Sequence, residues 1–346
     1  LDASGKPINA HGGGMLFHEG VYYWYGEFKE GPTWAPESNK SWGGTRVVAM
    51  GVSCYSSTNL YDWEFRGLVL PAVKDDESHD LHRSKVIERP KVIYNRQTRK
   101  FVMWMHIDSE DYKAARAGMA ISDSPVGPFH YLGSIRPHAG IWPQNATAAD
   151  KRAHPSNYLA RDFEGGQMAR DMTLFQDDDG KAYWFYSSEE NATMHVALLS
   201  DDYLKPSGIY VRIFPGRSME APAVFKRNGK YYLIASGCTG WEPNAARSGV
   251  AENILGPWRE LENPWRGADA ELSYHSQSTY VQPVHGLPDT YLFMADRWNS
   301  TNLPDSRYIW FPLRFEANGQ PRIEWQDNWS FPERRSPNSS NAAHQK

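Results

Sequence analysis

Five stretches of the chain repeat one pattern, in which turn residues are followed by a dense apolar run. Gly, Asn or Asp occupies most of the turns, and the runs are wholly apolar or alternate with polar positions. This pattern predicts a β-hairpin that leads into a buried strand. The five stretches are HEGVYYWYGE (18–27), NRQTRKFVMWMH (95–106), DDDGKAYWFYSS (177–188), RNGKYYLIASG (227–237) and GLPDTYLFMAD (286–296). Five similar hairpins in one chain predict an all-β fold, a five-bladed β-propeller.

Outer segments that contain Asp or Asn, Pro, Gly and an aromatic residue follow most of the hairpins and complete the repeat. The predicted blades are Gly13–Leu70, Ser84–Ile135, Ala169–Ser207, Met219–Leu261 and Ser273–Trp325. No linker or shift in composition divides them, so we expect residues 1–335 to form a single propeller domain. The polar segment 336–346 is expected to be a disordered tail.

Two long segments interrupt the period. Residues Gly31–Thr45 separate two strands of the first blade, and Arg136–Gly166 is a polar connection between the second and third blades. Long loops on a repeat scaffold are usually functional or disordered. We expect both loops to shape the mouth of a binding site.

The composition narrows the classes of molecule that the protein is expected to bind. The chain has 346 residues, of which 40% are hydrophobic and 23% are charged, as in ordinary globular proteins. No apolar run is long enough to enter a membrane, and a net charge of −4 without a basic stripe argues against nucleic acid. The chain starts LDASGKP without a signal peptide, as a mature or trimmed product would. Cys54 and Cys238 either pair or, as we favour, are small buried apolar residues.

Polar residues recur just before the apolar strand that leads into each hairpin, which in a propeller is the innermost strand. They are His11, Glu88, Asp171, Glu220 and Gln277. Because inner strands surround the axis, we expect these five side chains to converge in one axial pocket. Burying an unpaired carboxylate is costly, so its recurrence favours function. The structural alternative is an ion network that pairs Glu88 and Asp171 with the neighbouring Arg89 and Arg170.

Convergent carboxylates without a metal-ligand motif suggest glycoside hydrolysis. One protonated carboxyl donates its proton to the leaving oxygen, and a second group activates water on the opposite face of the sugar. The acid needs a raised pKa, which burial and a neighbouring carboxylate provide.

A family resemblance points the same way. The chain resembles glycoside hydrolase family 43, and within it the subfamily 24 exo-β-1,3-galactanases, from Ile8 to about Trp310. The segments that carry the resemblance are INAHGGG, YYWYGE, ERPKVIYN, RDMTLF, EAPAVFKRNGKYYLIASGCTGW and HSQSTYV. The family implies a five-bladed propeller as catalytic domain and an inverting mechanism.

The resemblance also implies residue roles. Glu220 matches the general acid, Asp171 matches the aspartate that raises the pKa of that acid, and Glu88 and Gln277 match residues that hold the terminal galactose. Further sugar contacts are expected at Arg89, Tyr112, Asn191 and Thr239, with Glu27 and His11 as additional candidates.

The general base is not fixed by the resemblance. Most of the family opens its first blade with an Asp–Pro pair whose aspartate is the base, whereas this chain has Asn9-Ala10-His11 there. The galactanase-like subfamily shares that loss. Three candidates remain open: Gln277 acting on the water through an amide tautomer, Glu88 as a conventional base, and His11.

The expected activity is the release of galactose from the non-reducing end of β-1,3-galactan, the backbone of arabinogalactan. The alternatives are an α-L-arabinofuranosidase or β-galactofuranosidase of the same family, and a carbohydrate-binding propeller without catalysis. No cofactor is expected, although a calcium ion in the axial channel, faced by His275, stays optional. The polysaccharide substrate implies a secreted or periplasmic enzyme, and we expect a monomer.

Overall fold

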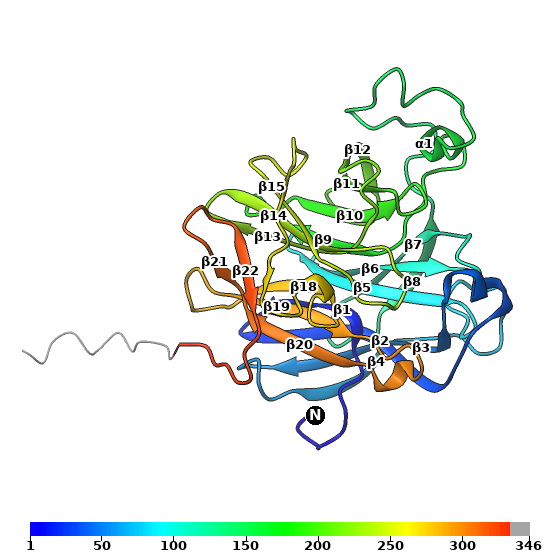
Figure 1. Ribbon diagram of the computed structural model, residues 1–346. Helices are drawn as coiled ribbons and strands as arrows, with labels where there is room; N and C mark the ends of the chain where they lie inside the picture. Colours follow the sequence, from blue (N-terminus) through cyan, green and yellow to red (C-terminus); the bar gives the residue numbers. More distant parts are fainter. Residues whose placement is uncertain (333–346) are drawn as a thin grey trace, which may run out of the picture.

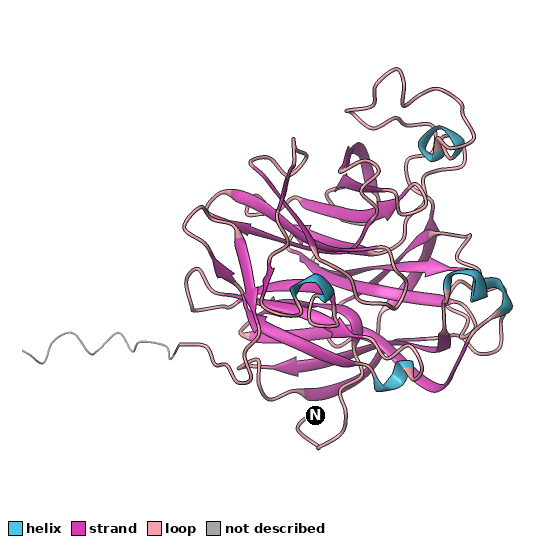
Figure 2. Cartoon of the chain, in the orientation of Figure 1, coloured by secondary structure: helices cyan, strands magenta, loops and turns pink. Residues whose placement is uncertain are grey.

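The computed structural model describes residues 1–332 (Figure 1), and most of its regular structure is β-strand (Figure 2). Four sheets have four strands each, and a fifth has three. They comprise β1 (His11–His18), β2 (Val21–Trp34), β3 (Arg46–Ser57) and β4 (Glu64–Pro71); β5 (Val86–Asn95), β6 (Lys100–Asp108), β7 (Arg116–Ser122) and β8 (His130–Ile135); β9 (Met172–Gln176), β10 (Ala182–Ser188), β11 (Thr193–Leu199) and β12 (Pro206–Ile213); β13 (Met219–Arg227), β14 (Lys230–Gly237), β15 (Arg247–Ala251) and β16 (Arg259–Leu261); and β18 (Gln277–Pro283), β19 (Tyr291–Arg297) and β20 (Arg307–Pro312). The short helices are η1 (Glu37–Trp42), α1 (Tyr158–Arg161), η2 (Ala270–Leu272) and η3 (Leu303–Asp305).

The predicted hairpins are all present, each in the expected stretch of sequence. The turn between β13 and β14 shows why the local residues specify them. Asn228 and Gly229 adopt φ values of 50° and 75°. Two consecutive positive φ angles give the turn whose twist matches antiparallel strands, and Asn-Gly is the pair that adopts it most readily.

The innermost strands of these five sheets close into a ring. β1 contacts β5 and β18, β9 contacts β5 and β13, and β13 contacts β18. Figure 1 shows these five strands gathered in the middle of the molecule. The predicted axial arrangement therefore exists, and four of the five polar residues predicted at the starts of these strands, all except His11, line one pocket.

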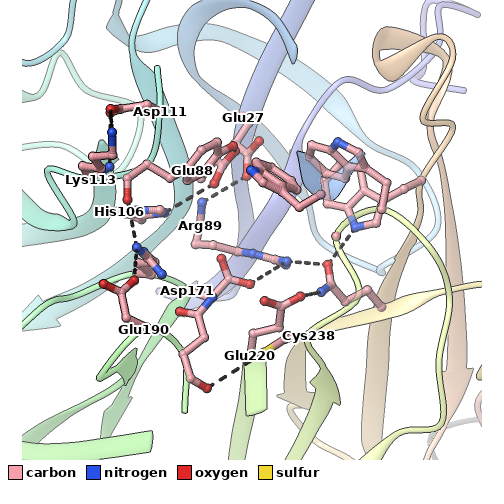
Figure 3. Close-up of a pocket in the computed structure, with 18 of the residues that line it drawn as sticks. Glu27, Glu88, Arg89, His106, Asp111, Lys113, Asp171, Glu190, Glu220 and Cys238 are labelled. Carbon is pink, nitrogen blue, oxygen red and sulfur yellow. Dashed lines mark hydrogen bonds and ion pairs between the residues drawn. The ribbon is translucent and has the colours of Figure 1, made fainter. Parts of the chain in front are cut away.

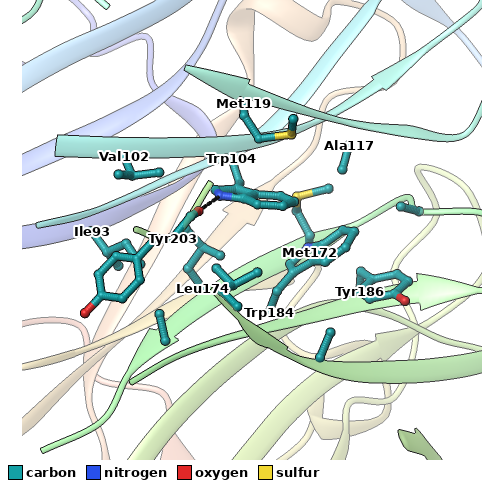
Figure 4. Packing of buried hydrophobic residues seen from close by; sticks show 14 of the residues in the cluster. Ile93, Val102, Trp104, Ala117, Met119, Met172, Leu174, Trp184, Tyr186 and Tyr203 are labelled. Atoms are coloured by element: carbon teal, nitrogen blue, oxygen red, sulfur yellow. Dashed lines mark hydrogen bonds between the residues drawn. The ribbon is translucent and has the colours of Figure 1, made fainter. Parts of the chain in front are cut away.

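Large aromatic side chains fill the space between neighbouring sheets. Between the second and third sheets, the ring centroids of Trp104 and Trp184 lie 4.9 Å apart, and both side chains are fully buried (Figure 4). The indole N–H of Trp104 donates to the backbone carbonyl of Tyr203 at 2.8 Å, so the one polar atom of this ring is satisfied. Each sheet is thus held by apolar burial against its neighbours.

The propeller prediction is confirmed, but its count of five is wrong, because residues 1–332 form six sheets. The sixth has the order β17 (Trp265–Arg266), β22 (Pro321–Glu324) and β21 (Arg314–Phe315). Its strands are only two to four residues long and come from two distant segments, with β17 and β22 parallel. They carry no hairpin pattern, so the repeat could not predict them. Trp265 and Ile323 bury this sheet in the apolar cluster of the fourth and fifth sheets.

The predicted blade ends need two corrections. The third sheet continues to Ile213 rather than ending at Ser207, and the fifth ends at Pro312, because the residues up to Trp325 belong to the sixth sheet. The predicted tail, 336–346, lies outside the described residues. Within residues 1–332, no helix is long and apolar enough to cross a membrane.

Candidate active site

A pocket of about 540 Å³ lies where the inner strands begin. The structure brings eight of the ten predicted site residues together there. They are Glu27, Glu88, Arg89, Tyr112, Asp171, Asn191, Glu220 and Gln277. The other lining residues are Ser38, Trp42, His106, Asp111, Lys113, Arg170, Glu190, Cys238, Gly240, Trp241 and Trp298. Figure 3 shows Arg89 beside Asp171, with Glu220 and Cys238 close together.

Backbone bulges aim the key side chains into this pocket. The pairing of β5 with β6 shifts register directly after Glu88, and that of β13 with β14 shifts directly after Glu220. The residues that follow, Arg89 and Ala221, have positive φ angles of 55° and 54°, and each precedes a proline. A bulge leaves a residue unpaired and re-aims a side chain, and bulges are common beside active sites. The local signal is therefore the Glu-X-Pro sequence at the start of an inner strand.

Glu220 has the environment of a general acid. Its Oε1 accepts a hydrogen bond from Gln277 Nε2 at 3.0 Å. Burial and then the negative charge of Asp171 raise the pKa of Glu220 to about 8. The carboxyl is therefore protonated at neutral pH and able to donate its proton.

Asp171 is fixed from two sides. Its Oδ2 lies 2.9 Å from Nη2 of Arg89 and accepts a hydrogen bond from the backbone N–H of Ala221 at 3.1 Å. The second contact ties Asp171 to the residue next to Glu220, so the distance between the two carboxyl groups is set by backbone geometry.

Glu88 is held as a carboxylate by two neighbours. Tyr112 donates its hydroxyl to Oε1 at 2.8 Å, and Nδ1 of His106 lies 3.3 Å from Oε2. Burial alone would raise the pKa of Glu88, but His106 and Tyr112 outweigh it and lower that pKa to about 2. Burial alone would lower the pKa of His106. Two carboxylates outweigh burial and raise this pKa to about 9: Asp108, which lies 2.9 Å from His106 Nε2, and Glu88. The imidazole is therefore a cation at neutral pH.

The side-chain amide of Gln277 is fully engaged. Oε1 accepts from Arg89 Nη2 at 2.5 Å and from Trp298 Nε1 at 2.8 Å, while Nε2 donates to Glu220 and to Ser236 Oγ at 2.9 Å. Because a guanidinium and an indole only donate, the orientation of this amide is unambiguous.

Glu27 lies beneath the pocket and supports it. Its carboxylate is 2.6 Å from Lys29 Nζ and accepts the backbone N–H of Arg89 at 3.0 Å. Burial raises the pKa of Glu27, and Lys29 opposes that shift. The contact with Arg89 N means that Glu27 stabilises the strained backbone at Arg89. Asn191, by contrast, lines the pocket with an Oδ1 that has no hydrogen-bond partner within residues 1–332.

His11 and Thr239 lie outside the pocket, which corrects both expectations. His11 is fully buried, stacks on Tyr308 with a centroid distance of 5.3 Å, and lies 3.8 Å from Asp296. It is therefore removed from the candidates for the base. The hydroxyl of Thr239 donates to the carbonyl of Glu242 at 2.6 Å and so closes a local turn.

Sequence reasoning missed several lining residues. His106 is the last residue of a predicted hairpin stretch and pairs with Glu88 across β5 and β6. Its place in the pocket could therefore have been predicted from the register of that hairpin. Trp298 follows β19 and gave no signal of its own. Cys238 is exposed in the pocket, contrary to the buried interpretation, and both cysteines are free. The loop Arg136–Gly166 does not line the pocket; it contacts lining residues through Arg161, 3.1 Å from Glu190, and through Arg136, which donates to the carbonyl of Lys113 at 2.9 Å.

One group of side chains has the spacing of a cation site. Single ligand atoms of Glu88, His106 and Asp171 lie within 4.8 Å of one another. In the present arrangement His106 lies between Glu88 and Asp108, and Asp171 is paired with Arg89. His275, expected to face an axial ion, is exposed in a neighbouring hollow.

The sequence model of the family "Glycosyl hydrolases family 43" matches residues 18–266 of this chain. The chain belongs to glycosyl hydrolases family 43. The predicted resemblance and the prediction of a glycoside hydrolase are therefore confirmed. The site described above is accordingly that of a family 43 enzyme.

Three similar structures cover most of the chain. The GH43 β-1,3-galactosidase BT3683 is 47% identical, with 95% of this chain and 98% of that chain covered and a TM-score of 0.86. The exo-β-1,3-galactanase from Clostridium thermocellum is 37% identical over 93% of this chain and 63% of that one, with a TM-score of 0.74. The exo-β-1,3-galactanase from Phanerochaete chrysosporium is 32% identical over 93% and 64%, again with a TM-score of 0.74. The chain thus spans less than two thirds of the two latter proteins.

A shorter match exists to the β-D-galactofuranosidase xynD from Aspergillus niger. It is 36% identical over 80 residues, which is 23% of each chain.

Replacing the acid should abolish most hydrolysis by this family 43 enzyme. In Glu220→Gln we expect the rate on an unactivated glycoside to fall about 10²–10⁴-fold, because general acid catalysis is lost. Aryl glycosides with good leaving groups should suffer less. Glu242→Gln is the matched control and should keep full activity, because Glu242 is exposed in the loop after β14 and does not line the pocket. Steady-state kinetics on both substrates decides, and an unimpaired Glu220→Gln enzyme would exclude this role.

Replacing Asp171 should lower the pH above which the enzyme loses activity. The acid works only while protonated, so activity falls as pH rises through the pKa of Glu220, which is about 8. In Asp171→Asn a neighbouring negative charge is removed, the Glu220 carboxylate becomes easier to form, and its pKa falls. The alkaline limb of the kcat/KM profile, which reports groups of the free enzyme, should therefore shift to lower pH. A limb that stays in place, with only a reduced plateau, would make Asp171 a structural residue.

Proposed function

We propose that the enzyme is an inverting exo-β-1,3-galactanase that releases galactose from the non-reducing end of β-1,3-galactan. The observation that carries this proposal is the position of Glu220, buried beside Asp171 in an axial pocket that has room for a sugar, where burial and that neighbour raise its pKa to about 8. A carboxyl that stays protonated at neutral pH is what an acid-catalysed glycosidase requires.

The closed axis supports exo action. Below the pocket, Lys91 is almost fully buried and donates to the carbonyl of Gly12 at 2.8 Å. A Cβ on Gly14 would lie only 2.6 Å from Lys91 Cδ, so this side chain packs closely against the inner strand β1. A pocket closed on this side favours a chain end, which it can enclose, over the middle of a polysaccharide.

The chemistry follows from the arrangement. Glu220 transfers its proton to the glycosidic oxygen as the bond from that oxygen to C1 breaks. Water attacks C1 from the opposite face, which inverts the anomeric centre, and the proton that this water loses passes to solvent. Glu220 then takes up a proton from solvent, and the charge of Asp171 favours this step because it disfavours a second anion beside it. Glu88, kept ionised by His106 and Tyr112, accepts hydrogen bonds from sugar hydroxyls.

Ligands in similar structures support the substrate class. The BT3683 structure holds galactodeoxynojirimycin, and structures of the Phanerochaete chrysosporium galactanase hold galactose or β-1,3-galactotriose. The match to a galactofuranosidase keeps β-galactofuranosidase as a second candidate, beside α-L-arabinofuranosidase, but it covers only 23% of the chain. A non-catalytic lectin would have no use for the raised pKa of Glu220.

We extend the proposal to the setting of the enzyme. The natural substrate is the β-1,3-galactan backbone of arabinogalactan, encountered by a secreted or periplasmic monomer. Catalysis proceeds without a metal cofactor, which predicts full activity after treatment with a chelator. The supporting observation is the pair of cations, Arg89 and His106, in the place where a metal ion would neutralise the carboxylates.

The proposed activity is tested by product analysis. We expect galactose as the first product from β-1,3-galactan, appearing as the α-anomer in NMR spectra recorded before mutarotation. Arabinan and aryl β-galactofuranosides are the comparison substrates and should react far more slowly. Faster release from either would select the second candidate, and initial β-galactose would indicate a covalent intermediate instead of inversion.

The identity of the water-activating group needs a separate test. We propose that Gln277 orients the water and that Glu88 anchors the sugar, because a carboxylate with a pKa of about 2 is a weak base. Gln277 Nε2 now lies 3.0 Å from Glu220, whereas the two catalytic groups of inverting enzymes usually stand about 6.5–9.5 Å apart. The entering sugar must therefore separate them.

On this proposal Gln277→Ala should lose turnover, whereas Glu88→Gln should mainly raise KM. Steady-state kinetics of both variants on β-1,3-galactobiose measures the split. Near-normal kcat in Gln277→Ala, together with lost kcat in a Glu88 variant that azide partly rescues, would transfer the base role to Glu88.

A further inference from the structure

The loop that interrupts the first blade is fixed at the mouth of the pocket. Asn39 is fully buried and donates to the carbonyl of Glu110 at 3.2 Å. Thr45 donates to the carbonyl of Ser300 at 2.7 Å and accepts the indole N–H of Trp241 at 3.0 Å through its own carbonyl. The loop is thus tied to three other parts of the propeller.

Trp42, the last residue of η1, is presented at this mouth. It lines the pocket, yet 46% of its side chain remains exposed. Tyr112 meets it edge-on at a centroid distance of 5.6 Å. Two glycines lie against its ring, since a Cβ on Gly44 would come within 2.1 Å of the ring and one on Gly240 within 3.6 Å. The indole is therefore held in place while much of its surface has no protein partner.

The path of the substrate leads to this indole. On the proposed function the terminal galactose lies between Glu88 and Glu220, with the buried Lys91 behind it. The sugar that leaves must therefore extend outward, through the mouth. Tyr112 joins the two regions, because its hydroxyl contacts Glu88 while its ring contacts Trp42.

We propose that Trp42 is the binding platform for the sugar on the leaving side of the cleaved bond. This inference rests on the proposed function and adds a second sugar site to it. A galactosyl unit has a face of C–H groups that packs on an indole, and covering an exposed aromatic ring removes apolar surface from water. The loop Gly31–Thr45 thereby gives the enzyme its preference for an oligosaccharide over a single sugar.

Calorimetry on the inactive Glu220→Gln background tests the platform, with galactose, β-1,3-galactobiose and β-1,3-galactotriose as ligands. Trp42→Ala should weaken the two oligosaccharides about tenfold, as expected for roughly 50 Å² of apolar surface, and leave galactose unchanged. Trp42→Phe should recover part of the loss. Trp34→Ala is the matched control, because Trp34 is 37% exposed in the same loop but does not line the pocket. It should bind all three ligands normally.

The outcomes separate the two proposals. Unchanged oligosaccharide affinity in Trp42→Ala would overturn the platform and leave the proposed function intact. Equal losses for galactose and the oligosaccharides would also overturn it, since Trp42 would then belong to the terminal galactose site. If the Glu220→Gln protein with Trp42 in place binds none of the three ligands, both the function and the platform fail.

Discussion

The active site depends on one buried guanidinium. Arg89 is nearly inaccessible, yet its side chain contacts Asp171 and Gln277, and its backbone N–H is held by Glu27. Glu27 lies in β2, Gln277 in β18, and Asp171 directly before β9, so Arg89 in β5 joins three other blades at the centre of the ring. A buried cation is costly unless paired and hydrogen-bonded, and the converging acceptors meet that need. Removing the Arg89 side chain would leave Asp171 without its cation and would take one of the two hydrogen-bond donors from the amide oxygen of Gln277.

The distorted backbone at Arg89 is linked to the contacts that this residue makes. Its positive φ belongs to the bulge that directly follows Glu88. A related bulge follows Glu220. There the backbone N–H of Ala221 is left out of the strand pairing and donates to Asp171 instead. Strain of this kind persists only when the surroundings enforce it. Here the Arg89 ion pair, the Glu27 contact and the two prolines supply that enforcement, so the catalytic geometry and the closure of the ring stabilise each other.

How far the sequence predicts this structure depends on how local each feature is. The hairpins were predictable because residues such as Asn228 and Gly229 determine their turns without help from the rest of the chain. The carboxyl residues were predictable from their position before inner strands. Trp42 and Trp298 were not, because their place at the pocket arises only when the ring closes. The sixth sheet was not predictable either, because it also forms only when distant segments meet: it pairs Trp265 with Ile323 across most of the fifth repeat.

The choice of acid follows from a balance of charge. Glu27 is paired with Lys29, Asp171 with Arg89, and Glu88 with the protonated His106. Each of these carboxyl groups has a cation within 4 Å. Glu220 has none among residues 1–332; its side-chain hydrogen bond comes from the neutral amide of Gln277. In a group of crowded carboxyl groups, the one without a cation is the one that keeps its proton, because a further negative charge there would be unpaired. The family resemblance predicts Glu220 as the acid, and the distribution of cations favours Glu220 over its three neighbours for that role.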